Sequence, residues 1–149
     1  MSARSKKQLS GKQVNAIVLR RLRKYDKLNF SESFAMFMGK AQLLELGLKK
    51  IHLMGKYGLE EEKIKNWSLG HVIAELKKRE CRGDFVGLLE ELKERRNYIA
   101  HELLADDAIM QKMIGSRAQR FAWKPLSHGL YQVEQAIVVH DFLVSNGFL

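Results

Sequence analysis

The sequence predicts an all-α protein, an antiparallel bundle of four to five helices preceded by a basic helical arm. Apolar residues recur at three- and four-residue steps over long segments, which is the spacing of one face of an α-helix. The 149 residues include a single proline and 11 glycines, so residues that break helices are scarce. A hydrophobic content of 46% is sufficient for the core of one ordinary globular domain.

The chain is organised around residues 84–104, which read DFVGLLEELKERRNYIAHELL. Its apolar positions follow the helical spacing: Phe85, Leu88, Leu89, Leu92, Ile99 and Leu103. Asp84 follows Gly83 and is predicted to be the N-cap, because its carboxylate can accept from the free N–H groups of the first turn. The segment therefore predicts one long amphipathic helix.

Arg96 falls within the apolar stripe of this helix. A guanidinium group keeps its charge there, and burying it without a partner costs about 3–5 kcal/mol. We expect a carboxylate of another helix, a second chain or an anionic ligand to contact it. Glu45 is the candidate carboxylate, although its spacing of four residues from Lys49 also suits a solvated ion pair.

His101 follows Arg96 by five residues, and Asn97 comes directly after the arginine. At about 100° per residue, Asn97 and His101 share a helix face, whereas Arg96 and His101 point roughly 140° apart. A straight helix therefore cannot direct Arg96 and His101 at one atom. Either the helix end is deformed, or the site is assembled from more than one copy of the chain.

The sequence RRNYIAH, with Arg96, Asn97 and His101, resembles the signature motif of the HEPN superfamily. The upstream segment SLGHVIAELKK is similar to the second helix of several such domains, and the resemblance covers about residues 30–149. HEPN domains are small helical bundles of prokaryotic defence and toxin–antitoxin systems and of larger RNA-processing proteins. The resemblance implies that the motif closes the third main helix. It also implies a homodimer in which two motifs meet in a cleft that cuts RNA without a metal ion.

The resemblance gives each motif residue a role. His101 would act as general base on the ribose 2′-hydroxyl or as acid on the leaving 5′-oxygen, since histidine exchanges protons near neutral pH. Arg96 would stabilise charge on the phosphorane through bidentate hydrogen bonds. Asn97 would orient His101 or the phosphate. The expected product is a 2′,3′-cyclic phosphate, because the neighbouring hydroxyl is the nucleophile.

Alternatives to a ribonuclease stay open. Many HEPN domains have lost activity and serve as RNA-binding, nucleotide-binding or dimerisation modules, in which the arginine is a core ion-pair partner. The family also suggests an antitoxin or a nucleotidyltransferase as a partner. In one branch, a nucleotidyltransferase modifies a tyrosine two residues after the histidine. Leu103 occupies that position here, so this modification is not expected.

Residues 1–29 are predicted to form a basic, partly flexible arm, and residues 30–149 the bundle. Residues 1–27 hold nine Lys and Arg residues against the single acidic Asp26, so they carry +8 of the chain's net charge of +9. From Lys12 onward, apolar spacing predicts a short amphipathic helix. Cations along its flank would hold RNA phosphates by releasing counterions: Arg20, Arg21, Arg23 and Lys24. A solubilising tail with a packing helix, or a membrane-surface helix, are the alternatives.

Helix start and stop signals divide the rest of the chain. We expect helices at about residues 31–57, 68–80, 106–113 and 127–146, and a charged connector with one or two helical turns at 59–66. Ser31 and Ser68 are the predicted N-caps, and Gly58, Gly115 and Gly147 the predicted ends. The apolar residues of the last helix cover more than one face, so it is expected to lie centrally or in a dimer interface.

Basic and aromatic residues alternate before Pro125, where Arg117 and Arg120 accompany Phe121 and Trp123. This pattern is typical of a surface on which bases stack while phosphates are paired. The alternative is a loop that the two aromatic residues anchor to the bundle.

Cysteine and histidine usage sets the remaining expectations. A lone cysteine, Cys81, cannot form an internal disulfide, and the chain has neither an apolar signal segment at its start nor an apolar run of about 18 residues. These features predict a soluble, cytoplasmic protein. The five histidines are scattered, and no zinc-type spacing, phosphate-binding glycine loop or nucleophile elbow is found. No metal and no cofactor are expected.

Overall fold

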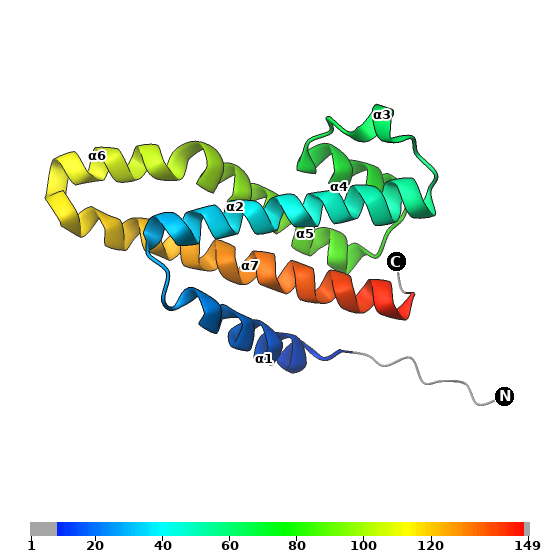
Figure 1. Cartoon of the computed structure of the whole chain (residues 1–149), viewed down its shortest axis with the longest axis horizontal. Helices are drawn as coiled ribbons and strands as arrows, with labels where there is room; N and C mark the ends of the chain where they lie inside the picture. Colours follow the sequence, from blue (N-terminus) through cyan, green and yellow to red (C-terminus); the bar gives the residue numbers. More distant parts are fainter. Residues whose placement is uncertain (1–8, 148–149) are drawn as a thin grey trace.

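Every element that the structure describes is helical, as the sequence predicts. The computed structural model describes residues 9–147 (Figure 1). Its α-helices are α1 (Gly11–Leu22), α2 (Phe30–Gly47), α3 (Glu61–Ile64), α4 (Leu69–Lys78), α5 (Gly83–Tyr98), α6 (Leu104–Ile114) and α7 (Ala118–Asn146). Two segments are π-helical, η2 (Leu48–Lys56) and η3 (Ile99–Leu103), and two are short 3-10 turns, η1 (Arg23–Tyr25) and η4 (Gly115–Arg117).

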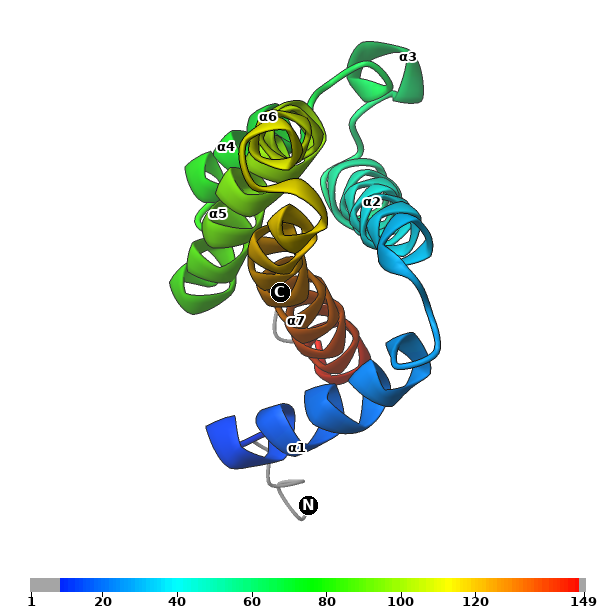
Figure 2. The ribbon, with the colours of Figure 1, turned by 90° about the vertical axis from the view of Figure 1, so that its left-hand side faces the viewer.

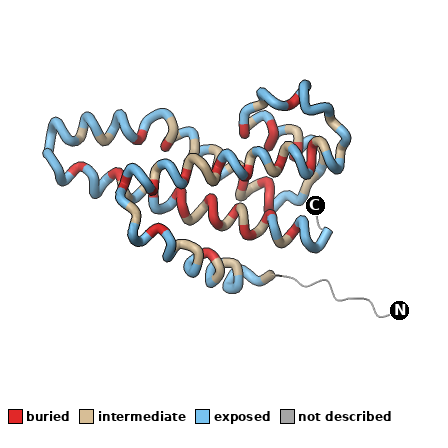
Figure 3. Tube along the Cα trace, viewed as in Figure 1, coloured by how far each residue is buried: buried red, intermediate tan, exposed pale blue. Residues whose placement is uncertain are grey.

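Helix α7 is the centre of the bundle. It packs against α1, α2, α5 and α6, and the end-on view shows α2 and α5 on different sides of it, with α1 crossing below (Figure 2). Its buried residues lie along its whole length: Ala118, Ala122, Leu126, Gly129, Leu130, Val133, Glu134, Ala136, Val138, His140 and Leu143. The buried positions in Figure 3 follow the same inner faces. The apolar residues on several faces of α7 are therefore explained by a central position in the bundle.

Capping residues and glycines in the sequence predicted several helix boundaries correctly. The hydroxyl of Ser68 accepts from the backbone N–H of His71 and caps α4. Gly58, Gly115 and Gly147 all adopt positive φ angles where helical segments end, a conformation that glycine adopts at little cost. The short helix α3 lies within the predicted connector.

Two predicted N-caps were wrong. Helix α2 is capped by Asn29, not by Ser31, because Asn29 and Glu32 form a reciprocal capping box. Helix α5 begins at Gly83, so Asp84 lies inside the first turn, where its carboxylate accepts from the backbone N–H of Phe85.

The chain is helical at two places where the sequence suggested a break. Helices α5 and α6 are joined by η3 into one continuous helical segment, with no cap at Asp106. Helix α7 begins at Ala118 and contains Pro125, so the loop predicted before this proline is helical. In this segment Ala118 and Ala122 are buried at a four-residue step, and α7 packs against α6.

The basic arm forms the predicted amphipathic helix. Ser10 caps α1, and Val18 is the residue that α1 buries. Tyr25 follows in η1 and is also buried. Residues 1–8, for which flexibility was predicted, and residues 148–149 lie outside the described residues.

Candidate functional site

The motif residues lie at the junction of α5 and η3. Arg96 and Asn97 belong to the last turn of α5, and His101 is the third residue of η3. Asn97 and His101 are exposed, and Arg96 is half-buried. Within residues 9–147, Arg96 forms no hydrogen bond and no ion pair. Arg96 is therefore less buried than its place in the apolar stripe suggests, and no carboxylate of residues 9–147 contacts it. Its guanidinium group is free to meet a ligand.

The π-helical turn η3 alters the direction of His101. A π-helix hydrogen-bonds each N–H to the carbonyl five residues back, whereas an α-helix uses the carbonyl four residues back. The wider turn rotates the chain by less than the roughly 100° per residue of an α-helix. His101 therefore points closer to the direction of Arg96 than a straight helix would allow. Of the two solutions that the sequence left open, the structure contains the deformed helix end.

Residues flanking the motif anchor this segment to the bundle. Nε of Arg95 donates to Oε1 of Gln132 on α7 at 3.3 Å. The Tyr98 hydroxyl donates to Oδ2 of Asp106 at 3.1 Å, and Ile99 is fully buried. Arg95 rather than Arg96 is thus the arginine that binds α7, which leaves the motif side chains available on the outside.

Glu45 does not pair with Arg96. Its Oε1 lies 4.0 Å from Nζ of Lys49, one turn later, and Lys49 also donates to the backbone carbonyl of Lys65 at 3.1 Å. Glu45 therefore pairs with Lys49, four residues later on the same helix. The predicted contact of Glu45 with Arg96 is wrong.

The basic arm divides into two pairs of cations. Arg20 and Arg23 are exposed, as an RNA-binding role requires. Arg21 is half-buried and Lys24 is also exposed, but both pair with α7, where they reach the carboxylate of Glu134 at 3.3 Å and 2.6 Å. Two of the four cations predicted to bind RNA therefore already have a partner within the bundle.

Glu134 is a fully buried carboxylate that the sequence analysis missed. It also accepts a hydrogen bond from the hydroxyl of Tyr25, and Nζ of Lys40 lies 3.8 Å away. Burial alone raises the pKa of Glu134, but the hydrogen bonds from Lys24 and Tyr25 outweigh it and the net pKa is lowered. Burial in turn lowers the pKa of Lys40, helped by the nearby Lys24. The sequence contained a signal for this residue, because Glu134 is a charged residue on the apolar face of the last helix. Arg96 occupies the same kind of position in its own helix.

Arg117 and Arg120 are exposed, at η4 and at the start of α7. Phe121 beside them is 62% exposed, whereas Trp123 is half-buried and makes an edge-to-face contact with Phe30. Only one of the two aromatic residues therefore anchors the segment, and the other is available to a ligand together with the two arginines.

The described part of the chain contains no group of three or more His, Cys, Asp or Glu side chains arranged to hold a metal ion. Among residues 9–147, no helix combines the length and the apolar character needed to span a bilayer.

Comparison with family models, with curated proteins and with solved structures finds no match to this chain.

Proposed function

We propose that this chain is a metal-independent endoribonuclease of HEPN type. The observation that carries the proposal is the π-helical turn η3, which follows Arg96 and Asn97 directly and presents His101 on the surface. π-helical turns inside α-helices are rare and occur frequently at functional sites. An unpaired arginine and an exposed histidine on one helical segment offer a cation for the phosphate and a group that can transfer a proton, both of which phosphodiester cleavage uses.

The chemistry follows from these groups. The 2′-oxygen of a ribose attacks the adjacent phosphorus, and His101 takes the proton from this hydroxyl or gives one to the 5′-oxygen that leaves. Arg96 has donors for two non-bridging oxygens, whose charge grows in the transition state. Asn97 lies one turn before His101 and orients it or the phosphate. The products are a 2′,3′-cyclic phosphate and a free 5′-hydroxyl.

Exposed cations support RNA as the substrate. Arg20 and Arg23 on the arm and Arg117 and Arg120 before α7 are all exposed, and each can pair with a phosphate. A homodimer would supply a second set of motif residues, so we expect dimerisation and activity to be lost together. A cytoplasmic role in defence or toxin–antitoxin control, with an antitoxin or a nucleotidyltransferase as partner, is the setting that the HEPN motif suggests.

The second candidate is a catalytically inactive RNA-binding or dimerisation module. One observation favours it, the apolar outer face of α2, where Met36, Leu43 and Leu46 are exposed. These residues line a shallow pocket of about 420 Å³ together with Ala35, Gly39, Lys40 and Gln42. An exposed apolar groove of this kind is typical of a protein-interaction surface.

The test is cleavage of a fluorescent single-stranded RNA in EDTA. Wild-type protein should cut it and leave 2′,3′-cyclic phosphate ends, and His101→Ala and Arg96→Ala should each lower the rate by at least about 100-fold. His128→Ala is the matched control, since His128 is also exposed but lies on α7. RNA with 2′-deoxyribose at the cleaved position should stay intact.

The same variants separate the candidates. A binding module would lose RNA affinity in Arg96→Ala and keep it in His101→Ala, with no cleavage by any variant. Equal cutting of the RNA and of its 2′-deoxy analogue would contradict the proposed mechanism, because the 2′-hydroxyl is its nucleophile.

A further inference from the structure

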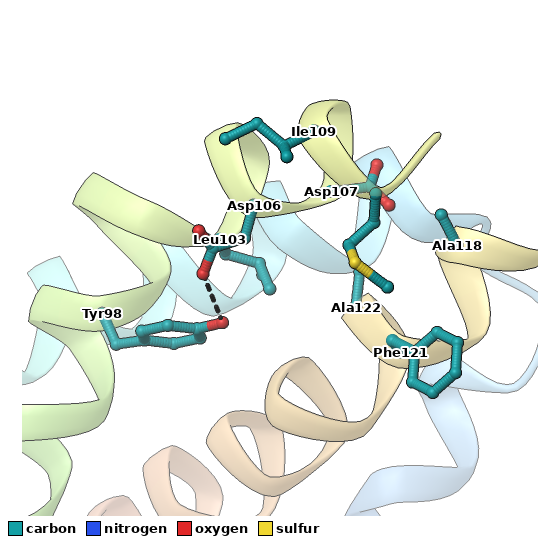
Figure 4. A pocket seen from close by; sticks show the side chains of 9 residues that line it. Tyr98, Leu103, Asp106, Asp107, Ile109, Ala118, Phe121 and Ala122 are labelled. Atoms are coloured by element: carbon teal, nitrogen blue, oxygen red, sulfur yellow. Dashed lines mark hydrogen bonds between the residues drawn. The ribbon is translucent and has the colours of Figure 1, made fainter. Parts of the chain in front are cut away.

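A pocket of about 350 Å³ lies beside the motif, between η3, α6 and the start of α7. Tyr98, the last residue of α5, also lines it, and Figure 4 shows the Tyr98 ring extending toward Asp106. Asp107 of α6 and Phe121 of α7 line the pocket as well. Leu103, which also lines it, belongs to the same π-helical turn as His101. The volume lies in the lower part of the range of small-molecule pockets, about 300–1,000 Å³.

The polar side of this pocket carries an acceptor without a donor. Oδ2 of Asp107 accepts from Nε2 of Gln111 at 2.8 Å. Its Oδ1 is buried and has no hydrogen-bond partner among residues 9–147. The neighbouring Asp106 differs, since it accepts from the Tyr98 hydroxyl. A buried carboxylate oxygen without a donor is unfavourable, so an N–H group of a ligand would be stabilised there.

The apolar side of the pocket suits a planar ring. Phe121 lines the pocket and is nevertheless 62% exposed, and the small Ala118 and Ala122 lie beside it on α7. Exposed aromatic rings of this kind stack with the bases of single-stranded RNA. Arg117 and Arg120 are exposed on the same segment and can pair with the phosphates on either side of a base.

We propose that this pocket binds one nucleobase of the RNA, and that it selects a base with an exocyclic amino group. The base stacks on Phe121, and its amino group donates to Oδ1 of Asp107. Adenine, cytosine and guanine carry such a group, whereas uracil offers only its ring N3–H, which lies between two carbonyl oxygens that a carboxylate repels. This inference rests on the proposed function, since it assigns the base preference of the same site through the turn that Leu103 shares with His101.

The experiment compares single-stranded oligouridine with oligouridines that contain one adenosine, cytidine or guanosine at the centre. Affinities are measured by fluorescence anisotropy with the non-cleaving variant His101→Ala, and cleavage positions are mapped for the wild type in EDTA. At least one amino-bearing base should raise affinity about tenfold over oligouridine, the effect of one hydrogen bond to a charged acceptor. Cleavage by the wild type should concentrate next to the same base.

Two variants test the two sides of the pocket in the same background. Asp107→Asn should remove the preference, because it replaces half of the acceptor by a donor of similar size. Phe121→Leu should lower the affinity for every base about tenfold, and Phe121→Tyr should restore it because it keeps the ring. Met113→Ala is the control, because Met113 is an exposed apolar residue of α6 that does not line the pocket. Thermal unfolding of each variant verifies the fold.

The results separate this inference from the ribonuclease proposal. A base preference that Asp107→Asn abolishes supports the inference even if no RNA is cut. Cleavage that depends on His101 but shows equal rates and affinities for all four oligonucleotides overturns the inference and leaves the ribonuclease proposal standing. A preference that survives both Asp107→Asn and Phe121→Leu overturns it as well.

Discussion

The hydroxyl of Tyr25 donates a hydrogen bond of 2.5 Å to Oε1 of Glu134. This contact joins the end of the N-terminal arm to the central helix α7, more than 100 residues later in the chain. Arg21 and Lys24 bind the same carboxylate from the arm, and Lys40 approaches it from α2. Since α1 and η1 bury Val18 and Tyr25 and Tyr131 donates to Asn15, the polar contacts to Glu134 add to other contacts that hold the arm.

Replacement of Glu134 by glutamine should loosen the arm. The variant Glu134→Gln keeps the size of the side chain but removes the charge that three cations share, so the free energy of unfolding should fall by about 1–3 kcal/mol. Urea denaturation followed by circular dichroism measures the change. Glu94→Gln is the matched control, because Glu94 is an exposed residue of α5 that pairs with Lys93, and its effect should stay within about 0.5 kcal/mol. Equal stabilities of the two variants would show that the arm does not depend on Glu134.

A second buried pair links η2 to α7. Nε2 of His52 and Nε2 of His140 lie 2.9 Å apart, and both side chains are buried. Because one nitrogen must donate and the other accept, both rings cannot carry a second proton together. Burial lowers the pKa of His52 to about 4, with His140 and Lys56 contributing. Burial also lowers the pKa of His140, although Asp141, 3.5 Å from its Nδ1, opposes this.

Acidification should therefore destabilise the bundle. In the unfolded chain, His52 takes up a proton near pH 6.5, whereas in the folded chain it does so only near pH 4. The contribution of His52 to the free energy of unfolding is therefore complete above pH 6.5 and is lost as the pH falls toward 4. At pH 5 the loss from His52 should be about 2 kcal/mol. Urea unfolding at pH 7.5, 6 and 5 measures it. The variant His52→Leu should flatten this dependence, whereas the exposed control His128→Gln should keep it; an unchanged slope in His52→Leu would refute the assignment.

The features that could be predicted were those that depend on residues close together in the sequence. Ser68 as a cap and the three glycines at helix ends depend on contacts within a few positions, and the structure confirms them. The all-helical class follows from periodicity over many turns. Asn29 displaced Ser31 as the cap of α2 because either residue could act and the reciprocal contact with Glu32 decided between them.

The geometry of the site depends on a local change of helix type and on contacts between distant residues, and sequence patterns show neither. A periodicity near 3.6 residues looks the same whether or not one π-helical turn interrupts it, so η3 could be anticipated only as one way to bring Arg96 and His101 together. The direction of Arg21 and Lys24 depends on Glu134 in a distant helix. That residue could have been found, because a charged side chain on an apolar face needs a partner.

Gly129 on α7 should be required for the packing of η3. A Cβ atom at this position would lie 2.7 Å from Cδ1 of Ile99 and 2.9 Å from Cε2 of Phe37, closer than carbon atoms pack. Gly129→Ala should therefore lower the free energy of unfolding by about 1–3 kcal/mol, although alanine favours a helix. If the ribonuclease proposal is correct, it should also slow cleavage, because Ile99 is the first residue of the turn that carries His101.

Gly87 on α5 provides the control for this substitution. A Cβ atom there has no neighbour within 4 Å among the described residues, so Gly87→Ala should stabilise the protein by about 0.5–1 kcal/mol. Equal effects of the two substitutions in thermal unfolding would show that the contact with Ile99 does not limit the packing.

Substitutions of the two pairs of cations in the arm should have different effects on RNA binding and on stability. Arg20→Gln combined with Arg23→Gln removes two exposed charges, so it should weaken RNA binding and reduce the slope of log affinity against log salt by about 2, with little change in stability. Arg21→Gln combined with Lys24→Gln removes the partners of Glu134 and should instead lower the unfolding temperature. Fluorescence anisotropy at several salt concentrations and thermal unfolding measure the two effects. If both double variants change the salt slope equally without loss of stability, the cations bound to Glu134 are available to RNA and the division of the arm is wrong.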